Sequence, residues 1–387
     1  MTGIDGFVAA GFERVREVFA AGFEREDEVG AGVCVYLDGR PVVDLWGGVA
    51  DRDSGREWTE DTLQLVWSVT KAMVSASVHL LVQRGQLDLD APVSTYWPEF
   101  AAEGKGRVPV RWLLSHQVGL PTLDKRVPVA DLLAWDPVVD ALARQRPFWE
   151  PGTRHGYHAE TFGFLAGEVV RRVSGRSVGW FFAEEIARPN GIEFWIGLPA
   201  ELEARVSTLI ELPSSQVREL SPEAREAIAV FSDPNSLSTR AFNLADPDYD
   251  ANSRGVHAAE LPASNGIGTA RGVARFYAGL IGEVDGQRIL AEETLRTALV
   301  EQAGGLDEIL LRPSRFGAGF MLPIDGGMAL GGPTSFGHPG KSGSLGFADP
   351  EHRITFGYAP NRSYVGFGGD FRAANLVEAV YAALPGR

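Results

Sequence analysis

The chain has 387 residues, of which 44% are hydrophobic and 22% are charged, so it is long enough to form two packed units around a sizeable core. Its 51 acidic residues outnumber the 36 basic ones, and the formal charge of -15 disfavours binding to nucleic acid or to an anionic membrane surface. Cys34 is the only cysteine, which excludes an intramolecular disulfide and a thiolate metal cluster.

The chain begins MTGIDGFVAAGFERVREVF, without the basic start and apolar core of a signal peptide. No stretch of about 20 residues is uninterruptedly apolar, so no membrane-spanning helix is predicted. We therefore expect a cytoplasmic protein without a membrane anchor.

Three elements are predicted in the first part of the chain. Residues 7–24 repeat apolar side chains every three or four positions, which predicts an amphipathic helix. Two β-rich runs around the turn LDGR predict a hairpin over residues 30–51. A loop and then an apolar helix ending at Gly85 are expected next, with capping residues in the TEDT segment at 59–62.

The later elements change from helices to strands. Residues from about 110 to 255 have a helical pattern with proline-rich loops. Strands are then predicted in RFGAGFMLPID (315–325), GGMALGG (326–332), SFGHPGKSGSLGFADP (335–350) and RITFGYAPN (353–361), followed by a closing helix in RAANLVEAVYAAL (372–384).

This order of elements predicts an α/β (α+β) fold in which an antiparallel sheet flanked by helices is assembled from both chain ends. We expect one domain to comprise residues 1–95 and 256–387. Residues 96–255 would then form an inserted helical domain, with the active site in the cleft between the two.

Ser68 and Lys71 are the candidate reactive pair, three positions apart at the start of the apolar run QLVWSVTKAMVSASVHLL (64–81). Helical spacing places them on one face, so the hydroxyl can meet the amine. Burial and the positive end of the helix dipole both disfavour an ammonium, so a neutral Lys71 could accept the serine proton. The alternative is an ordinary polar first turn, but only four of the 36 basic residues are lysines, which favours a reactive role.

Further motifs follow Ser68 and Lys71 along the chain. In order, the motifs are WSVTKAMV, LVQRGQLDLDAPVSTYWPEF, VRWLLSHQVGLP, FWEPGTRHGYHAETFGFLAGEVVRRVSG, GIGTARGVARF and FGHPGKSGSLGFADPEHRITFGYAPN. Together they resemble the serine β-lactamase and penicillin-binding-protein superfamily, and within it the family VIII carboxylesterases, which share the class C β-lactamase fold. The resemblance runs from about residue 30 to the C-terminus.

The resemblance implies a role for each motif residue. Ser68 corresponds to the acylated nucleophile and Lys71 to the lysine that activates it. Tyr157, in HGYHAE, corresponds to the proton relay or general base, and an ammonium beside it would favour its phenolate. The alternative for Tyr157 is a loop aromatic that only packs beneath the site.

The HPG segment corresponds to the K-T-G or H-T-G strand of the superfamily, which implies substrate contacts for His338 and Gly340. The backbone N–H groups of Ser68 and Lys341 would then form the oxyanion hole, with the Lys341 side chain pointing to solvent. A strand-end histidine satisfied by the backbone is the alternative. A second alignment takes KSG (341–343) as the match, but the spacing to the DP turn favours HPG.

Two departures from the β-lactamase pattern bear on the substrate. Ala159 replaces the asparagine of Tyr-x-Asn, and His338 with Pro339 replaces the lysine and threonine that bind a substrate carboxylate. Both changes weaken recognition of an anionic β-lactam and favour an uncharged ester.

Two other signals are predicted not to be catalytic. GRSVG (175–179) has the form of a nucleophile elbow, but a helix precedes it, so Ser177 is expected to be an N-cap. The histidines at 116, 155 and 158 are not spaced as metal ligands, and no metal or other cofactor is expected.

The resulting functional prediction is a serine carboxylesterase. It would hydrolyse small, short-acyl carboxylic esters through a Ser68 acyl-enzyme, with acyl transfer to alcohols as a further reaction of that intermediate. The alternatives are a β-lactamase or D-aminoacyl peptidase with the same residues, and a non-catalytic scaffold. The expected partner is a small-molecule ester, and the sequence leaves homo-oligomer formation open.

Overall fold

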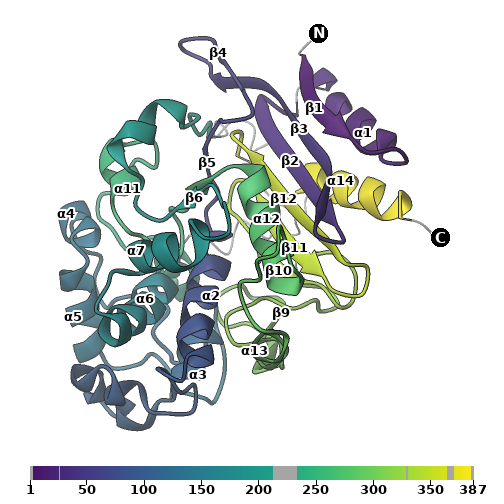
Figure 1. Ribbon diagram of the computed structural model, residues 1–387. Helices are drawn as coiled ribbons and strands as arrows, with labels where there is room; N and C mark the ends of the chain where they lie inside the picture. Colours follow the sequence, from purple (N-terminus) through teal and green to yellow (C-terminus); the bar gives the residue numbers. More distant parts are fainter. Residues whose placement is uncertain (1–2, 26, 212–232, 328–329, 364–369, 385–387) are drawn as a thin grey trace.

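The computed structural model describes residues 3–25, 27–211, 233–327, 330–363 and 370–384. Figure 1 shows a twisted sheet with helices on both faces and a group of helices beside it.

The sheet has seven antiparallel strands, in the order β1-β3-β2-β12-β11-β10 with β4 paired to β3. These strands are β1 (Ile4–Val8), β2 (Gly30–Leu37), β3 (Arg40–Asp51), β4 (Arg56–Glu57), β10 (Phe336–Pro339), β11 (Leu345–Asp349) and β12 (Ile354–Pro360). Phe356 of β12 lies opposite Val35 of β2 on one side and Phe347 of β11 on the other. The predicted antiparallel sheet built from both chain ends is therefore confirmed.

The hairpin predicted over residues 30–51 is formed by β2 and β3. Its turn residues Asp38 and Gly39 both have positive φ angles, of 52° and 74°. Asp-Gly is the pair that such two-residue turns favour. Helices cover both faces of the central strands, which explains why β2 is buried along almost its whole length and reads as a continuous apolar run.

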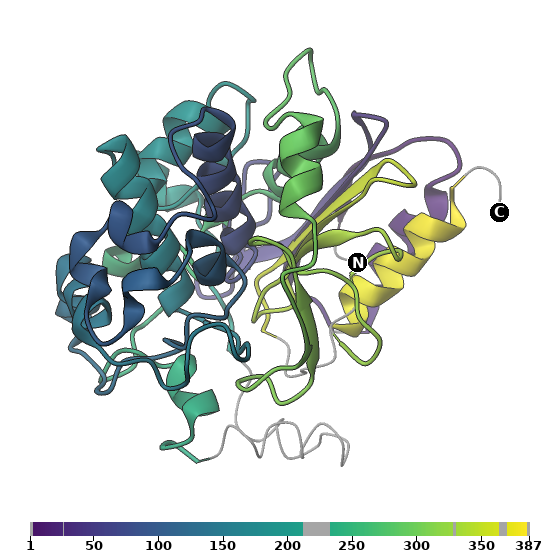
Figure 2. The same ribbon diagram turned by 90° about the horizontal axis from the view of Figure 1, so that it is seen from below.

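Among the described residues, helices pack on both faces of the sheet. Helix α12 (Ala270–Ile281) lies against β2, β11 and β12. Helices α1 (Glu13–Glu24) and α14 (Phe371–Ala382) lie side by side on the opposite face, as Figure 2 shows from below. An added Cβ on Gly357 would overlap the carbonyl of Ala270, so glycine permits the close approach of α12 to β12.

Most of the remaining helices lie between β5 and β7 in the chain. They are α2 (Thr70–Gln83), η1 (Val93–Thr95), η2 (Pro98–Ala101), η3 (Lys105–Arg107), α3 (Val110–Leu114), α4 (Val129–Leu133), α5 (Asp136–Arg144), α6 (Thr161–Ser174), α7 (Val178–Phe182), η4 (Ala183–Ala187), η5 (Ala200–Arg205), α10 (Leu237–Ala241) and α11 (Arg254–Ala258), with α13 (Glu292–Ala298) later. The small sheets contain β5 (Gln64–Leu65), β7 (Ile267–Gly268) and β6 (Phe194–Trp195), and β8 (Ala303–Leu306) with β9 (Pro313–Phe316).

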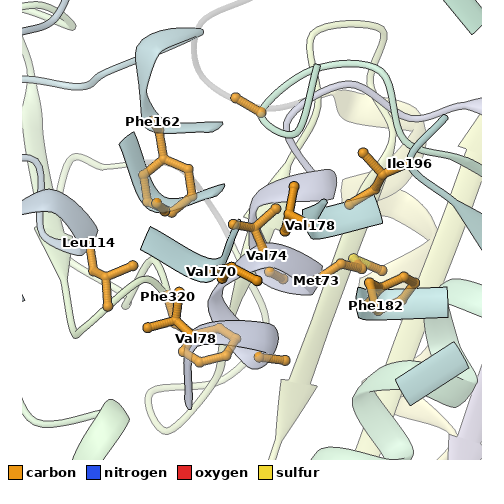
Figure 3. Close-up of a cluster of buried hydrophobic side chains, with 14 of the residues drawn as sticks. Met73, Val74, Val78, Leu114, Phe162, Val170, Val178, Phe182, Ile196 and Phe320 are labelled. Carbon is orange, nitrogen blue, oxygen red and sulfur yellow. The ribbon is translucent and has the colours of Figure 1, made fainter. Parts of the chain in front are cut away.

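Helix α2 lies at the centre of the larger core. Every residue from Thr70 to Leu81 is buried. Figure 3 shows Met73, Val74 and Val78 of α2 among side chains of α6 and α7, including Phe162 and Phe182. A helix that is apolar on all sides is held within a core, so the first turn of α2 is both fixed and desolvated.

Two predictions near the N-terminus are wrong. The predicted helix over 7–24 starts only at Glu13, because residues 4–8 pair with β3 and Gly11 then turns the chain with a φ of +94°. The TEDT segment does not cap α2, which begins at Thr70. Instead, the Thr59 N–H donates to Thr62 Oγ1 in a turn before β5.

The strands predicted over 315–332 also need correction. Strand β9 ends at Phe316, and Met321 makes only isolated bridges to Phe316 and Gly337. Four glycines within 317–327 have little β-propensity, which explains the loss of regular pairing. Residues 328–329 of the predicted GGMALGG strand lie outside the described residues.

The described helices include none long and apolar enough to cross a bilayer. The domain boundaries at residues 95/96 and 255/256 remain a prediction. Helix α2, which that division assigns to the sheet domain, packs against α6 and α7 of the helical group.

Candidate active site

The candidate nucleophile Ser68 lies two residues before α2, in the turn that leads into the helix, and Trp67 before it has a φ of +50°. A positive φ is uncommon outside glycine and marks a sharp change of chain direction. Ser68 Oγ lies 3.0 Å from Lys71 Nζ. Helix geometry therefore brings the two side chains together as the spacing predicts.

Two backbone carbonyls complete the surroundings of the Lys71 amine. Nζ donates to Ala159 O at 2.7 Å and to Ala263 O at 3.0 Å. A neutral amine has two N–H donors and one lone pair. Because both carbonyls can only accept, they take the two N–H groups and leave the lone pair facing Ser68 Oγ. The site is thus arranged so that a neutral Lys71 accepts the serine proton.

Burial supplies the electrostatic condition for that arrangement. The Lys71 side chain is only 1% exposed, and this desolvation lowers the pKa of its amine well below the ordinary range. The carboxylate of Glu160 acts in the opposite direction but is the smaller influence.

Tyr157 lies in the irregular segment before α6, with its ring centroid 4.8 Å from Lys71 Nζ. Burial raises the pKa of its hydroxyl, and the hydrogen bond with Ser68 opposes that rise only in part. This desolvation favours the phenol form of Tyr157 and opposes the expected stabilisation of its phenolate, because the same burial lowers the pKa of the neighbouring Lys71 amine.

His338 stands at the end of β10, next to the tyrosine. Its Nδ1 lies 2.7 Å from Pro339 O and must donate to that carbonyl. The neutral ring then presents Nε2 as an acceptor, 3.3 Å from the Tyr157 hydroxyl. Burial lowers the pKa of His338 to about 3, so the ring is uncharged near neutral pH.

Gly340 and Lys341 follow in a tight turn against the segment that leads to Ser68. The Gly340 N–H donates to Ser344 O at 2.7 Å, and an added Cβ on Gly340 would overlap Val66 O. Within the described residues, the backbone N–H groups of Ser68 and Lys341 have no acceptor in the protein, which leaves both available to an oxyanion. The Lys341 side chain is exposed but does not simply point to solvent, because its Nζ lies 4.9 Å from the Trp67 ring centroid.

A pocket of about 300 Å³ opens beside Ser68. It is lined by Trp67, Ser68, Ala159, Glu160, Glu211, Phe242, Asn243, Ala245, Asp248, Tyr249, Ala251, Ser264 and Lys341. Glu160 accepts hydrogen bonds from the Leu244 N–H and the Tyr249 hydroxyl, and its burial raises its pKa to about 7. Three of the lining side chains are carboxylic acids, of which Glu160 is only partly ionised near neutral pH, and one is a lysine, so the pocket has no excess of positive charge to attract an anion.

Glu160 and Asp307 also belong to the site, although they were not among the predicted site residues. Asp307 Oδ1 accepts the backbone N–H of Tyr157 at 2.9 Å, although the two residues lie 150 positions apart in the chain. Glu160 could have been considered from its place three residues after Tyr157, whereas no local pattern points to Asp307. Ser177 is confirmed as the N-cap of α7, accepting from the Trp180 N–H.

Comparison with known proteins agrees with the motifs and the fold. Residues 15–381 match the family model described as Beta-lactamase, and the chain belongs to that family. It is similar to a family VIII carboxylesterase of known crystal structure, with 40% identity, a TM-score of 0.86 and coverage of 99% of this chain and 100% of that one.

Two further relatives are esterases by name. EstA from Arthrobacter nitroguajacolicus Rue61a has 34% identity and a TM-score of 0.87, with 98% of each chain covered. The Esterase/beta-lactamase LipL of Mycobacterium tuberculosis has 36% identity over 361 residues, which are 91% of this chain and 81% of LipL. The predicted resemblance to family VIII carboxylesterases is confirmed.

Proposed function

We propose that this protein is a serine carboxylesterase that hydrolyses small, short-acyl carboxylic esters through an acyl-enzyme on Ser68. The observation that carries the proposal is the Ser68 hydroxyl 3.0 Å from a buried lysine amine whose two N–H groups are taken by backbone carbonyls. Burial lowers the pKa of this amine and so favours its neutral, basic form, and Nζ lies within hydrogen-bonding distance of the Ser68 hydroxyl that lines the pocket.

In the acylation half, Lys71 takes the Ser68 proton while Oγ attacks the ester carbonyl. The negative charge that develops on the carbonyl oxygen is stabilised by the N–H groups of Ser68 and Lys341. Tyr157 then turns its single O–H from Nε2 of neutral His338 to the departing alkoxide, gives up that proton and regains one from the Lys71 ammonium.

In the second half, water enters the same position and attacks the acyl-enzyme, with the proton transfers reversed. The products are the carboxylic acid and free Ser68. An alcohol in place of water forms a new ester, so acyl transfer needs no additional residue.

Charge and size support an uncharged, small substrate. His338 is neutral where β-lactamases carry a lysine, and Glu211 and Asp248 line the pocket together with a single Lys341. The pocket therefore has no excess of positive charge to bind a substrate carboxylate. The pocket volume of about 300 Å³ lies at the lower end for small-molecule sites, which favours short acyl groups.

The test compares p-nitrophenyl acetate, p-nitrophenyl butyrate and nitrocefin, with the wild type and Ser68→Ala. We expect turnover of both esters, little or no turnover of nitrocefin, and no ester turnover by the variant. Mass spectrometry should find the acyl adduct on Ser68. Faster nitrocefin hydrolysis would favour the β-lactamase that the name of LipL includes, and no turnover of any substrate would favour a scaffold.

A further inference from the structure

A fully buried carboxylate lies behind Tyr157, outside the substrate pocket. It belongs to Asp307, at the end of β8 in the loop to β9, and its exposed fraction is 0%. Oδ1 accepts the N–H groups of Tyr157, Ile309 and Leu310, each at 2.9 Å. Oδ2 accepts the Ser314 hydroxyl at 2.8 Å. One carboxylate therefore fixes its own loop and the backbone of a residue from the middle of the chain.

Two further contacts connect the same loop to the segment that carries Tyr157. The Glu308 N–H donates to His155 O at 3.1 Å. Ser314 Oγ lies 2.9 Å from His155 Nε2. The segment before α6 has no regular secondary structure of its own, so its placement depends on these contacts.

Ser314, His155 and Asp307 are not a second catalytic triad. The single hydroxyl proton of Ser314 goes to the Asp307 carboxylate. His155 Nε2 must therefore donate to Ser314 Oγ, whereas a catalytic histidine accepts the serine proton. The three side chains also are buried, which leaves their role to the geometry of Tyr157.

The opposite side of the segment is fixed by His116. Its carbonyl accepts the Gly156 N–H at 3.0 Å, and its Nδ1 accepts the His158 N–H at 3.1 Å. Tyr157 thus sits between an anchor from the helical group and an anchor from the β8–β9 loop. The second anchor is the one that holds the tyrosine's own N–H.

We propose that Asp307 is a positioning residue, which holds Tyr157 at the distance from Ser68 and His338 that proton transfer to the leaving alcohol requires. The inference rests on the proposed esterase function. A hydrogen-bonded proton transfer is sensitive to displacements of about 1 Å, which can cost about 10²-fold in rate. Loss of the anchor should therefore slow the step that depends on Tyr157 as a proton donor.

Two esters with the same acyl group separate this role from general damage. Ethyl butyrate and p-nitrophenyl butyrate form the same butyryl-enzyme on Ser68, so they differ only in the acylation step. Ethoxide is a poor leaving group and needs a proton as it departs, whereas p-nitrophenolate leaves without one. The ratio of kcat/KM for the two esters therefore reports proton donation, and a change in the amount of active enzyme cancels.

The variants are Asp307→Ala, Asp307→Asn and Ser314→Ala, with Asp349→Ala as a matched control. Asp349 is also 0% exposed and accepts from Thr334, Tyr381 and other groups, but it lies at the far end of β11. For Asp307→Ala we expect a loss of about 10²-fold on ethyl butyrate and about tenfold on p-nitrophenyl butyrate. Asparagine keeps an Oδ1 acceptor for the Tyr157 N–H, so its ratio should stay within about threefold of the wild type.

Equal losses on both esters with Asp307→Ala, or the same change of ratio with Asp349→Ala, would overturn the inference. If Asp307→Ala does not fold, the ratio of kcat/KM measured for Ser314→Ala tests the inference. This substitution removes the hydrogen-bond partner of Oδ2 and of His155 Nε2 but keeps the Oδ1 contact with Tyr157, so it should shift the ratio in the same direction by about threefold. An unchanged ratio refutes the proposal. A wild type that hydrolyses neither ester would instead refute the proposed function.

Discussion

Replacement of Lys71 by methionine removes the amine and keeps an unbranched side chain in the first turn of α2. Burial lowers the pKa of the wild-type amine well below its ordinary value of 10.5. Between that lowered pKa and 10.5, the unfolded chain carries a proton on Lys71 that the folded protein lacks. The free energy of unfolding therefore increases as pH rises across this window and decreases as pH falls.

The size of the effect follows from proton linkage. The wild type should gain stability over Lys71→Met by at most about 1.4 kcal/mol per pH unit, or at most about 2.7 kcal/mol between about pH 7 and about pH 9. The variant also leaves the carbonyls of Ala159 and Ala263 without their donor. That loss costs about 1–3 kcal/mol for each carbonyl and does not depend on pH.

Urea denaturation followed by tryptophan fluorescence at the two pH values gives the difference directly. Lys105→Met is the matched control, because Lys105 is also a buried lysine, donating to Gln145 O with its pKa lowered by burial to about 8. Both variants should show the same direction of pH dependence. Only Lys71→Met should lose ester hydrolysis, by about 10²- to 10⁴-fold. A stability difference for Lys71→Met that is constant with pH would mean a charged amine in the folded protein and would refute the reasoning.

Three further substitutions test the neighbouring groups. Tyr157→Phe should lower kcat/KM on ethyl butyrate by about 10²-fold or more, and a loss below about threefold would assign the proton relay to another group. His338→Gln should lower activity without changing the shape of the pH–rate profile above about pH 5, because a histidine with a pKa of about 3 is already neutral there. An inflection of the wild-type profile above about pH 5 that the variant abolishes would contradict a neutral His338. Gly343 has a φ of +94°, and an added Cβ there would overlap Asp370, whereas Gly286 has a φ of +76° and its added Cβ would meet nothing within 4 Å. Gly343→Ala should therefore lower stability by about 1–3 kcal/mol more than Gly286→Ala. Equal urea midpoints for the two variants would refute the clash.

Local chemistry was sufficient to predict several elements of the fold. The Asp-Gly turn marked the β2–β3 hairpin, and the glycine after the apolar run marked the end of α2. The predicted meeting of Ser68 and Lys71 needed only the spacing of one helical turn. In each case the deciding interactions lie within a few residues of one another.

The remaining features depend on residues far apart in the chain. Val8 and its neighbours become a strand because β3 offers an edge, a choice that helical periodicity does not contain. The burial of Tyr157 depends on rings from distant parts of the chain, among them His116, Phe242 and Phe316. Asp307 has no motif of its own, because its function is to accept an N–H group that the folded structure brings to it.

The pairing of β12 with β2 also has a consequence for synthesis. During translation, β2 can pair with β3 on one edge as soon as both have been synthesised. More than 300 further residues must then be synthesised before β12 can pair with the other edge of β2. That free edge belongs to a strand buried along nearly its whole length, which makes it a template for pairing with another nascent chain. Contacts of such long sequence separation also form slowly. We therefore expect folding yield in cells to depend on residues 354–360 and on chaperones that shield the waiting edge, although none of these residues touches the substrate pocket.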